Sequence, residues 1–198
     1  MTTARENPFA SRRVESLRYR FPGFDFSKEV KRLEAMCWRA EILGPHGSGK
    51  TTLLLELFEY LKTRDTDRKC RFWFVPREID SQAEQWQTLC QECTADEIVM
   101  IDGIERLSWM RRAQIVRRLP TRIAGGNRFP RSVVITTHRP MGLPLWLKTD
   151  TSRELLLELL LELNPLADQN MQRTAEQIFA RSNGNVREVF WQLYDRIS

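Results

Sequence analysis

The chain has 198 residues, of which 41% are hydrophobic and 29% charged, and its formal net charge is +5. This is a globular composition, and the length suits one moderate domain, or a core with a small lid, that can bury a sizeable core. The charge excess permits an acidic partner without requiring one.

The chain contains no pattern typical of membrane or exported proteins. Its first residues, MTTARENPFASRR, include no apolar segment of the kind that export signals carry. The longest leucine-rich run, residues 155–163, is interrupted by Glu158 and Glu162. We therefore expect no signal peptide, no membrane span and no membrane partner.

Four cysteines in a chain without an export signal suggest free thiols in a reducing compartment, so we expect the protein to be cytoplasmic. Cys90 and Cys93 form a CxxC pair on a predicted helix. Because no second CxxC exists, core or surface thiols are favoured over a zinc or redox site.

The start of the chain predicts an irregular arm followed by one helix. Pro8 breaks the periodicity of the arm, whereas apolar residues recur at helical spacing after Ser27. A short β-prone run at residues 39–43 then predicts the first strand.

The most specific motif follows this strand. GPHGSGKT fits the phosphate-binding loop pattern G-x-x-x-x-G-K-[ST], and an apolar helical pattern continues from about Gly49 to Leu61. Glycines let consecutive N–H groups point at phosphate oxygens, and the helix N-terminus adds partial positive charge. Lys50 is expected to reach the β- and γ-phosphates, and the Thr51 hydroxyl to bind Mg²⁺. We assign to the nucleotide Gly44, Pro45, His46, Gly47, Ser48, Gly49, Lys50, Thr51 and Thr52.

A second informative stretch is residues 96–107. Ile98 to Ile101 form a continuous apolar run, as a strand buried on both faces requires, and Asp102 stands at its C-terminal end. In phosphate-loop proteins such a Walker B aspartate holds Mg²⁺ directly or through water. Together with the upstream loop, this predicts Asp102 as a metal ligand; a helix-capping aspartate is the alternative.

Strands and helices alternate through the rest of the chain. The helix after Ser108 is expected to turn Trp109, Ala113 and Val116 inward. The other predicted elements are strands at 69–75, 131–137 and 145–149, and helices at 81–93, 153–163, 171–181 and 186–197.

This order predicts an α/β fold: a three-layer αβα P-loop NTPase with a parallel sheet of about five strands and a small C-terminal helical lid. The expected parts are an N-terminal arm and helix at 1–37, a nucleotide-binding core at 38–150 and the lid at 151–198. The nucleotide is expected at the C-terminal ends of the strands.

In sequence terms, residues 38–198 resemble the additional-strand branch of phosphate-loop ATPases, specifically the AAA+ and STAND groups (NACHT-like or ORC-like). The resemblance rests on the loop, on Asp102 and on the polar end TTHR of the fourth strand. It implies ATP and Mg²⁺ as ligands, and Thr137 or His138 as a γ-phosphate sensor. It also implies that Arg187, in the lid segment GNVR, is a second phosphate sensor.

One position departs from the AAA+ pattern. Most AAA+ proteins place a glutamate directly after the Walker B aspartate to orient the attacking water, but Gly103 stands here and Glu105 comes two residues later. The D-G-x-acid order resembles the NACHT group, which implies Glu105 as the water-orienting base. A solvated residue in a first helical turn explains Glu105 equally well. We therefore expect slow or partner-dependent hydrolysis.

A basic block extends from Arg106 to Thr149, with nine arginines, one lysine and no acidic residue. It suits nucleic acid phosphate, a membrane surface or an acidic partner, but acidic residues at 78–97 and 150–168 allow internal pairing instead. No recognised DNA-binding motif accompanies the block. Nucleic acid is thus one candidate partner beside an unknown protein or self-association, with Arg139 as a candidate finger acting on a neighbouring subunit's nucleotide.

The leading hypothesis is a Mg²⁺-dependent AAA+/STAND-like ATPase that acts as a nucleotide-driven switch or motor, in which ATP closes the helical lid. A small-molecule or nucleotide kinase uses the same loop, and Arg77, Glu78 and Asp80 offer a thin acceptor site. A nucleotide-binding interaction module that never hydrolyses is consistent with Gly103. A GTPase is less favoured because no N-K-x-D motif occurs.

Overall fold

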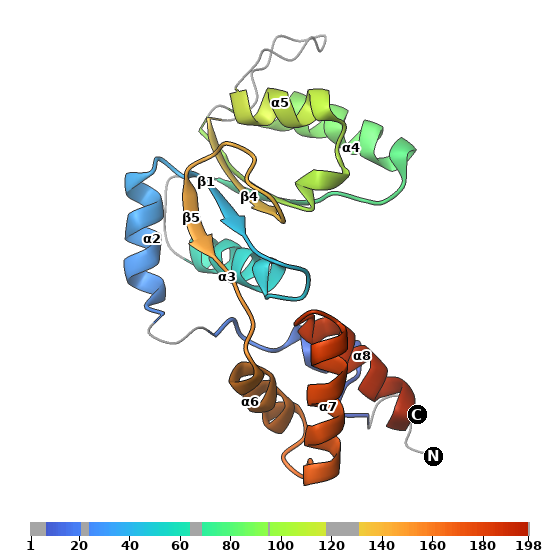
Figure 1. Cartoon of the computed structure of the whole chain (residues 1–198). Coiled ribbons are helices and arrows are strands. Elements are labelled where there is room, and N and C mark those ends of the chain that lie inside the picture. The colour runs from blue at the N-terminus through green and yellow to red at the C-terminus, as the bar shows by residue number, and fades with distance from the viewer. Residues whose placement is uncertain (1–6, 21–23, 64–68, 95, 118–130, 198) are drawn as a thin grey trace. The chain divides into compact units, whose positions relative to one another are not determined.

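The structure is a computed structural model of the chain, and it describes residues 7–20, 24–63, 69–94, 96–117 and 131–197. The chain forms two compact units (Figure 1). The first unit comprises Met1–Pro22, Gly44–Thr52 and Thr149–Ser198, and the second comprises Gly23–Leu43 and Leu53–Lys148.

The second unit is built on a five-stranded sheet in the order β2-β3-β4-β1-β5. Its strands are β1 (Arg39–Leu43), β2 (Cys70–Phe74), β3 (Ile98–Asp102), β4 (Ser132–Thr137) and β5 (Leu145–Lys148). Every neighbouring pair is parallel, with β4 between β1 and β3. The C-terminal ends of β1, β3 and β4 therefore share one edge of the sheet. The predicted α/β fold with about five parallel strands is confirmed.

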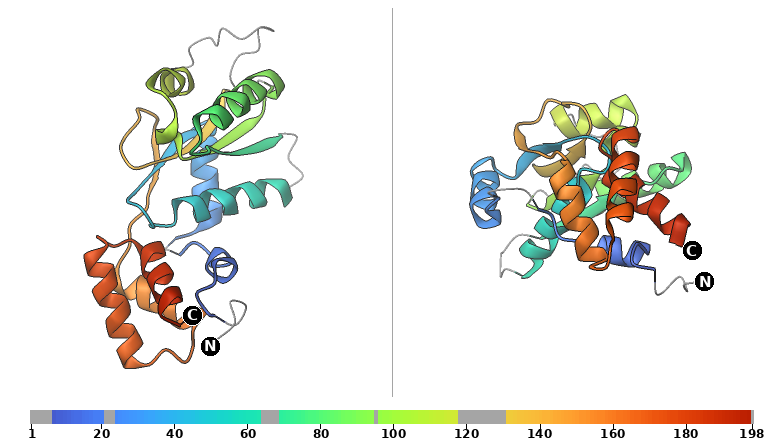
Figure 2. Two further views of the ribbon diagram at one scale, coloured as in Figure 1. Left: turned by 90° about the vertical axis from the view of Figure 1, so that its right-hand side faces the viewer. Right: turned by 60° about the horizontal axis from the view of Figure 1, so that its bottom comes forward.

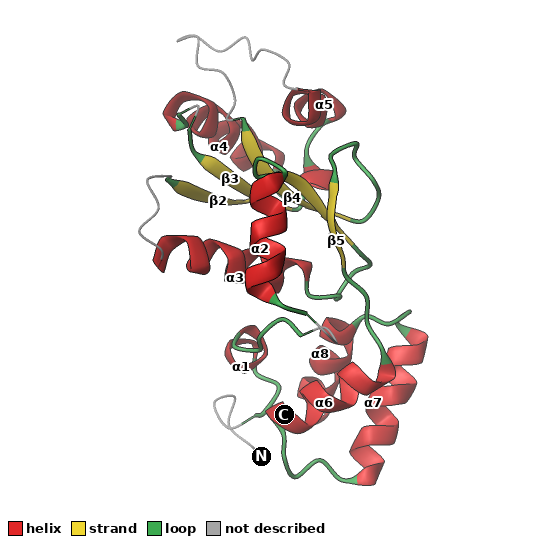
Figure 3. Ribbon diagram, turned by 90° about the vertical axis from the view of Figure 1, so that its left-hand side faces the viewer, coloured by secondary structure: helices red, strands yellow, loops and turns green. Residues whose placement is uncertain are grey.

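Helices cover both faces of this sheet, as the fully buried β3 and β4 require (Figure 3). On one face, α4 (Ile79–Glu92) and α5 (Trp109–Arg117) share a core with Val99 and Val133. On the other face lies α3 (Lys50–Thr63), and its Leu54 and Leu57 are fully buried. The helix α2 (Phe26–Ala35) also belongs to this unit. A hydrogen bond from Trp146 Nε1 to the Glu29 carbonyl, at 2.9 Å, joins it to β5.

The expected inward face of α5 is wrong at its first residue. Trp109 is 72% exposed, whereas Ile115 is fully buried in the core that α4 and α5 share with the sheet. The short helix buries only the stripe around Ile115, and Val116 packs partly against the same core. A nine-residue helix contains too few apolar positions for its sequence to fix which stripe faces inward.

The first unit is a helical bundle (Figures 1 and 2). Its main helices, α6 (Arg153–Leu163), α7 (Gln169–Arg181) and α8 (Val186–Ile197), enclose one hydrophobic core. The N-terminal arm belongs to the same bundle: the Phe9 ring stacks on Phe190 with 5.8 Å between centroids, and Asn7 Nδ2 donates to the Tyr194 carbonyl at 3.0 Å. The arm also contains a short helix that periodicity did not predict, α1 (Ser11–Glu15).

Side-chain caps fix the starts of several helices. Ser152 accepts the Leu155 N–H before α6, and Asp168 accepts the Met171 N–H before α7. Because Asp168 is the cap, α7 begins at Gln169, two residues earlier than predicted. None of the helices in the described parts of the chain has the length and apolarity needed to cross a membrane.

A buried arginine joins β1 to α5. Arg39 is 9% exposed, and its guanidinium donates to the carbonyls of Ile115 (2.9 Å), Val116 (2.6 Å) and Arg131 (3.3 Å). Two of these carbonyls lie in the last turn of α5, where no intrahelical donor is available.

We expect Arg39→Met to lower the free energy of unfolding by about 2–4 kcal/mol, because buried carbonyls would lose their donors. Urea denaturation measures this loss. The control is Lys62→Met on α3, whose pair with Glu59 is exposed at both side chains and worth at most about 1 kcal/mol. Equal losses in the two variants would contradict the bridging role of Arg39.

Candidate functional site: a phosphate-binding loop and a polar strand edge

Residues 44–52 form the loop after β1 and the first turn of α3. Gly47 and Gly49 have φ angles of +73° and +81°, a region that favours glycine. Lys50 is 7% exposed, and its Nζ donates to the carbonyls of Gly44 (2.8 Å) and Pro45 (2.6 Å). The loop thus combines one buried ammonium group with a backbone whose glycines adopt positive φ angles. Ammonium and backbone N–H groups are donors suited to phosphate.

Other segments of the first unit enclose this loop. A Cβ atom added to Gly47 would collide with the Asn185 side chain, and one added to Gly49 would lie 3.0 Å from Tyr19 Cδ2. Ser48 Oγ lies 2.6 Å from Thr149 Oγ1 and also donates to the Pro45 carbonyl. The N-terminal arm, the segment after β5 and the start of α8 therefore all contact the loop.

The lid segment GNVR meets the loop through its asparagine. Asn185 lies against Gly47, and its Oδ1 accepts the Glu188 N–H at 3.2 Å, which caps α8. Arg187 follows in the first turn of α8, and its side chain is exposed. The predicted second sensor thus stands two residues from a direct loop contact within the same unit.

In the second unit, Asp102 ends β3 and is 6% exposed. Thr136 Oγ1, on neighbouring β4, donates to Asp102 Oδ1 at 2.5 Å and accepts the Gly103 N–H at 3.2 Å. One hydroxyl group therefore fixes both the carboxylate and the backbone that follows it. Sequence reasoning missed Thr136, although a polar residue near the end of the apolar strand SVVITT was an available signal.

Glu105 and His138 form a pair in the second unit. Glu105 lies in the short 3₁₀ helix η1 (Ile104–Arg106), and its Oε1 is 3.2 Å from His138 Nε2. Its Oε2 is buried and has no hydrogen-bond partner among the described residues. The side chain is one-third exposed, so Glu105 is not simply a solvated residue of a first helical turn. The structure thus brings Glu105, the predicted base, together with His138, one of the two residues predicted to sense the γ-phosphate.

Thr137, the other residue predicted to sense the γ-phosphate, forms hydrogen bonds within the turn after β4. Thr137 is fully buried, and its Oγ1 donates to the Arg139 carbonyl at 2.6 Å and accepts the Arg139 N–H at 3.3 Å. Its hydroxyl proton is therefore committed to the backbone that follows β4. Arg139 itself is exposed.

Two arginines in the described part of the basic block pack against neighbouring groups. Arg106 Nη1 donates to the Val75 carbonyl at 2.6 Å, and its guanidinium lies 5.0 Å from the Phe74 ring centroid. The Arg111 guanidinium lies 5.9 Å from the Trp86 ring centroid. These arginines pack within the unit. Residues 118–130, with three further arginines of the block, lie outside the described residues.

The CxxC pair consists of buried free thiols. Desolvation raises the pKa of Cys90 to about 11 and that of Cys93 to about 12. Within the described parts of the chain, no group of three or more His, Cys, Asp or Glu side chains could hold a metal ion. These findings favour a packing role for both cysteines.

No protein-family model and no curated protein matches the chain. Solved structures similar to it include two point mutants of Thermotoga maritima RuvB. One has a TM-score of 0.51 and 18% identity, over 84% of this chain and 58% of that chain. The other has a TM-score of 0.46 and 14% identity, over 85% of this chain and 67% of that chain.

The chain thus spans less than two thirds of the length of the first of these structures. At 18% identity the likeness concerns the fold alone. Together with the five-stranded parallel sheet covered by helices on both faces, it shows that the chain has an α/β fold like that of this RuvB structure.

Because burial opposes ionisation of Cys90 and Cys93, we expect both to resist alkylation at pH 8, whereas exposed Cys37 reacts quickly. Mass spectrometry after a short iodoacetamide pulse reports each thiol. The same pulse in urea should label all four cysteines. Rapid labelling of Cys90 or Cys93 in the folded protein would contradict their burial.

Proposed function

We propose that the protein binds ATP with Mg²⁺ and hydrolyses it as an AAA+/STAND-like switch or motor. The observation that carries this proposal is the loop GPHGSGKT between β1 and α3, with the buried Lys50 ammonium held against the loop. The sheet order adds support: β4 lies between β1 and β3, so its polar end stands beside the ends of both motif-bearing strands.

The donor set fits Mg-ATP. The Lys50 ammonium suits the β- and γ-phosphates, and the Thr51 hydroxyl and Asp102 carboxylate are the oxygen ligands that Mg²⁺ prefers. Thr136 holds Oδ1 of Asp102, which orients the carboxylate for the metal or its bound water. Bound Mg²⁺ would neutralise the charge that develops on the phosphates during hydrolysis.

Glu105 is the proposed acceptor of the proton from the attacking water, and His138 is the residue that positions it. While Nε2 of His138 holds Oε1, the carboxylate is kept in one orientation. To act as a base, Glu105 must place a carboxylate oxygen within hydrogen-bond distance of the attacking water. The contact with His138 competes with that arrangement, which agrees with slow or partner-dependent turnover.

The helical bundle of the first unit is the proposed lid, with Arg187 as a second phosphate sensor. Contact between Asn185 and Gly47 supports this role, because it joins the GNVR segment directly to the loop. A protein partner or self-association is the preferred interaction. Nucleic acid binding by the basic block has less support, since Arg106 and Arg111 pack internally.

We expect Glu105→Gln to reduce phosphate release by about 10²–10⁴-fold while ATP binding is retained, because the amide cannot accept the proton of water. Lys50→Ala should lose ATP binding itself. Phosphate release and a titration with a fluorescent ATP analogue distinguish these outcomes. Full turnover in Glu105→Gln would show that Glu105 is not the base. Failure of the parent protein to bind ATP would contradict the proposed function as a whole.

Thr136→Val keeps the shape of the side chain but removes the hydroxyl group that holds Asp102. We expect the Mg²⁺ concentration needed for half-maximal phosphate release to rise by about tenfold, the effect typical of losing a residue that orients a metal ligand. The matched control is Thr88→Val on α4, an exposed threonine bonded only to its own helix. An unchanged Mg²⁺ dependence in Thr136→Val would refute the positioning role.

A further inference from the structure

The linker that follows β5 contacts both the phosphate-binding loop and the helical bundle. Residues 149–152 read TDTS and belong to the first unit, as do the loop and the bundle. Ser152 caps α6. The two threonines of the linker have partners elsewhere: Thr149 contacts the loop, and Thr151 contacts the turn between α7 and α8.

Thr149 holds the loop. Its side chain is fully buried, and its Oγ1 lies 2.6 Å from Ser48 Oγ, which is itself buried. Because the Ser48 hydroxyl donates its proton to the Pro45 carbonyl, Thr149 is the donor of this pair. A Cβ atom added to Gly44 would lie 2.6 Å from the Thr149 carbonyl oxygen. Thr149 thus packs against the loop at both Gly44 and Ser48.

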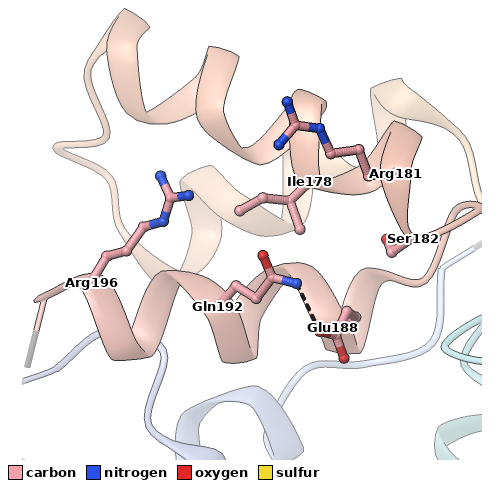
Figure 4. Close-up of a pocket in the computed structure, with 6 residues that line it drawn as sticks. All are labelled: Ile178, Arg181, Ser182, Glu188, Gln192 and Arg196. Atoms are coloured by element: carbon pink, nitrogen blue, oxygen red, sulfur yellow. Dashed lines mark hydrogen bonds between the residues drawn. The ribbon is translucent and has the colours of Figure 1, made fainter.

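Thr151 holds the turn that precedes α8. Its Oγ1 donates to the Gly184 carbonyl at 2.8 Å. The turn is also fixed from within, because the Gly184 N–H donates to the Phe179 carbonyl at 2.9 Å. Ser182, which lines the groove between α7 and α8 (Figure 4), donates to the same carbonyl at 3.3 Å. The linker therefore binds a turn that already has a defined shape.

Asn185 completes a closed set of contacts. It follows Gly184 directly, and its side chain lies against Gly47, the neighbour of Ser48. Contacts therefore run from the loop through the linker to the turn, and from the turn back to the loop. We call this set the clasp; its members are Gly47, Ser48, Thr149, Thr151, Gly184 and Asn185.

The two linker hydroxyl groups join distant segments of the chain. Serine and threonine hydroxyls commonly bond within a few residues of their own position, as Thr137 does with Arg139. The partner of Thr149 lies 101 positions away, and that of Thr151 lies 33 positions away. Capping the end of β5 or shaping a local turn would need neither bond.

The clasp fixes the helix start that carries Arg187. Asn185 caps α8 through the Glu188 N–H, and Arg187 lies in the first turn. The Arg187 side chain is exposed, so its reach is set by the position of the backbone and not by packing around it. A charge held in place before the ligand arrives loses less entropy on binding.

We propose that Thr149 and Thr151 are positioning residues that hold Arg187 at a fixed place relative to the phosphate-binding loop. This inference rests on the proposed function, because it takes ATP as the ligand of the loop and Arg187 as a sensor of its γ-phosphate. It adds a role for the linker, to which that function assigns none. ADP has no γ-phosphate, so the clasp matters for the triphosphate and not for the diphosphate.

The test titrates the full chain with ADP or with AMP-PNP, an ATP analogue that resists hydrolysis, in the presence of Mg²⁺. Thr149→Val/Thr151→Val should weaken AMP-PNP binding about five- to tenfold and ADP binding less than about twofold, as expected for the loss of neutral hydrogen bonds. Ser48 keeps its bond to the Pro45 carbonyl in this variant, so the loop retains its shape. The matched control is Thr174→Val, a half-buried threonine of α7 outside the clasp, which should bind both ligands like the parent chain.

Two further measurements separate positioning from a general loosening of the unit, which would weaken both ligands alike. In an Arg187→Ala background, Thr151→Val should cause no further loss of AMP-PNP affinity, because the residue through which it acts is gone. In the ligand-free chain, Thr149→Val/Thr151→Val should speed hydrogen exchange in peptides that cover residues 44–49 and 183–189, whereas Thr174→Val should not.

Equal weakening of ADP and AMP-PNP would overturn the positioning role while leaving nucleotide binding intact. So would unchanged hydrogen exchange in both peptides of the clasp variant. A parent chain that binds neither nucleotide would instead contradict the proposed function and, with it, the role of Arg187.

Discussion

The position of β4 between β1 and β3 is the constraint on which the polar site of the second unit depends. Parallel pairing aligns Val133 with both Arg39 and Val99, so the three strands end at one edge of the sheet. Because β4 pairs with β3, the hydroxyl of Thr136 reaches Asp102 on the next strand. The burial of β3 and β4 on both faces then keeps water from competing for that hydrogen bond.

Sequence patterns predicted the strands and most helices because strong local signals agreed with one another. Continuous apolar runs marked the buried strands, and Ser108 marked a helix start that the structure keeps. Trp109 was misplaced because α5 is short and its apolar positions do not define one stripe. The arm was expected to be irregular because nothing local indicates that Phe9 stacks on Phe190, far along the chain.

The candidate site divides in the same way. The loop could be predicted from its spacing, since glycines and Lys50 act within nine consecutive residues. The contacts that complete the polar edge join distant parts of the chain: Thr136 with Asp102, and His138 with Glu105. Each depends on strand order, which periodicity does not determine. For this reason Thr136 was missed, and Glu105 could not be distinguished from a solvated residue.

Arginines that follow one another along the chain need not form a charged surface in the folded protein. The run from Arg106 to Thr149 looks like a basic surface in sequence, yet Arg106 and Arg111 are used against backbone and aromatic rings. Arg181 and Arg196 belong to no basic run, but α7 and α8 place both of them beside one groove (Figure 4). A guanidinium group that already has a carbonyl or a ring as its partner has less to gain from an external anion.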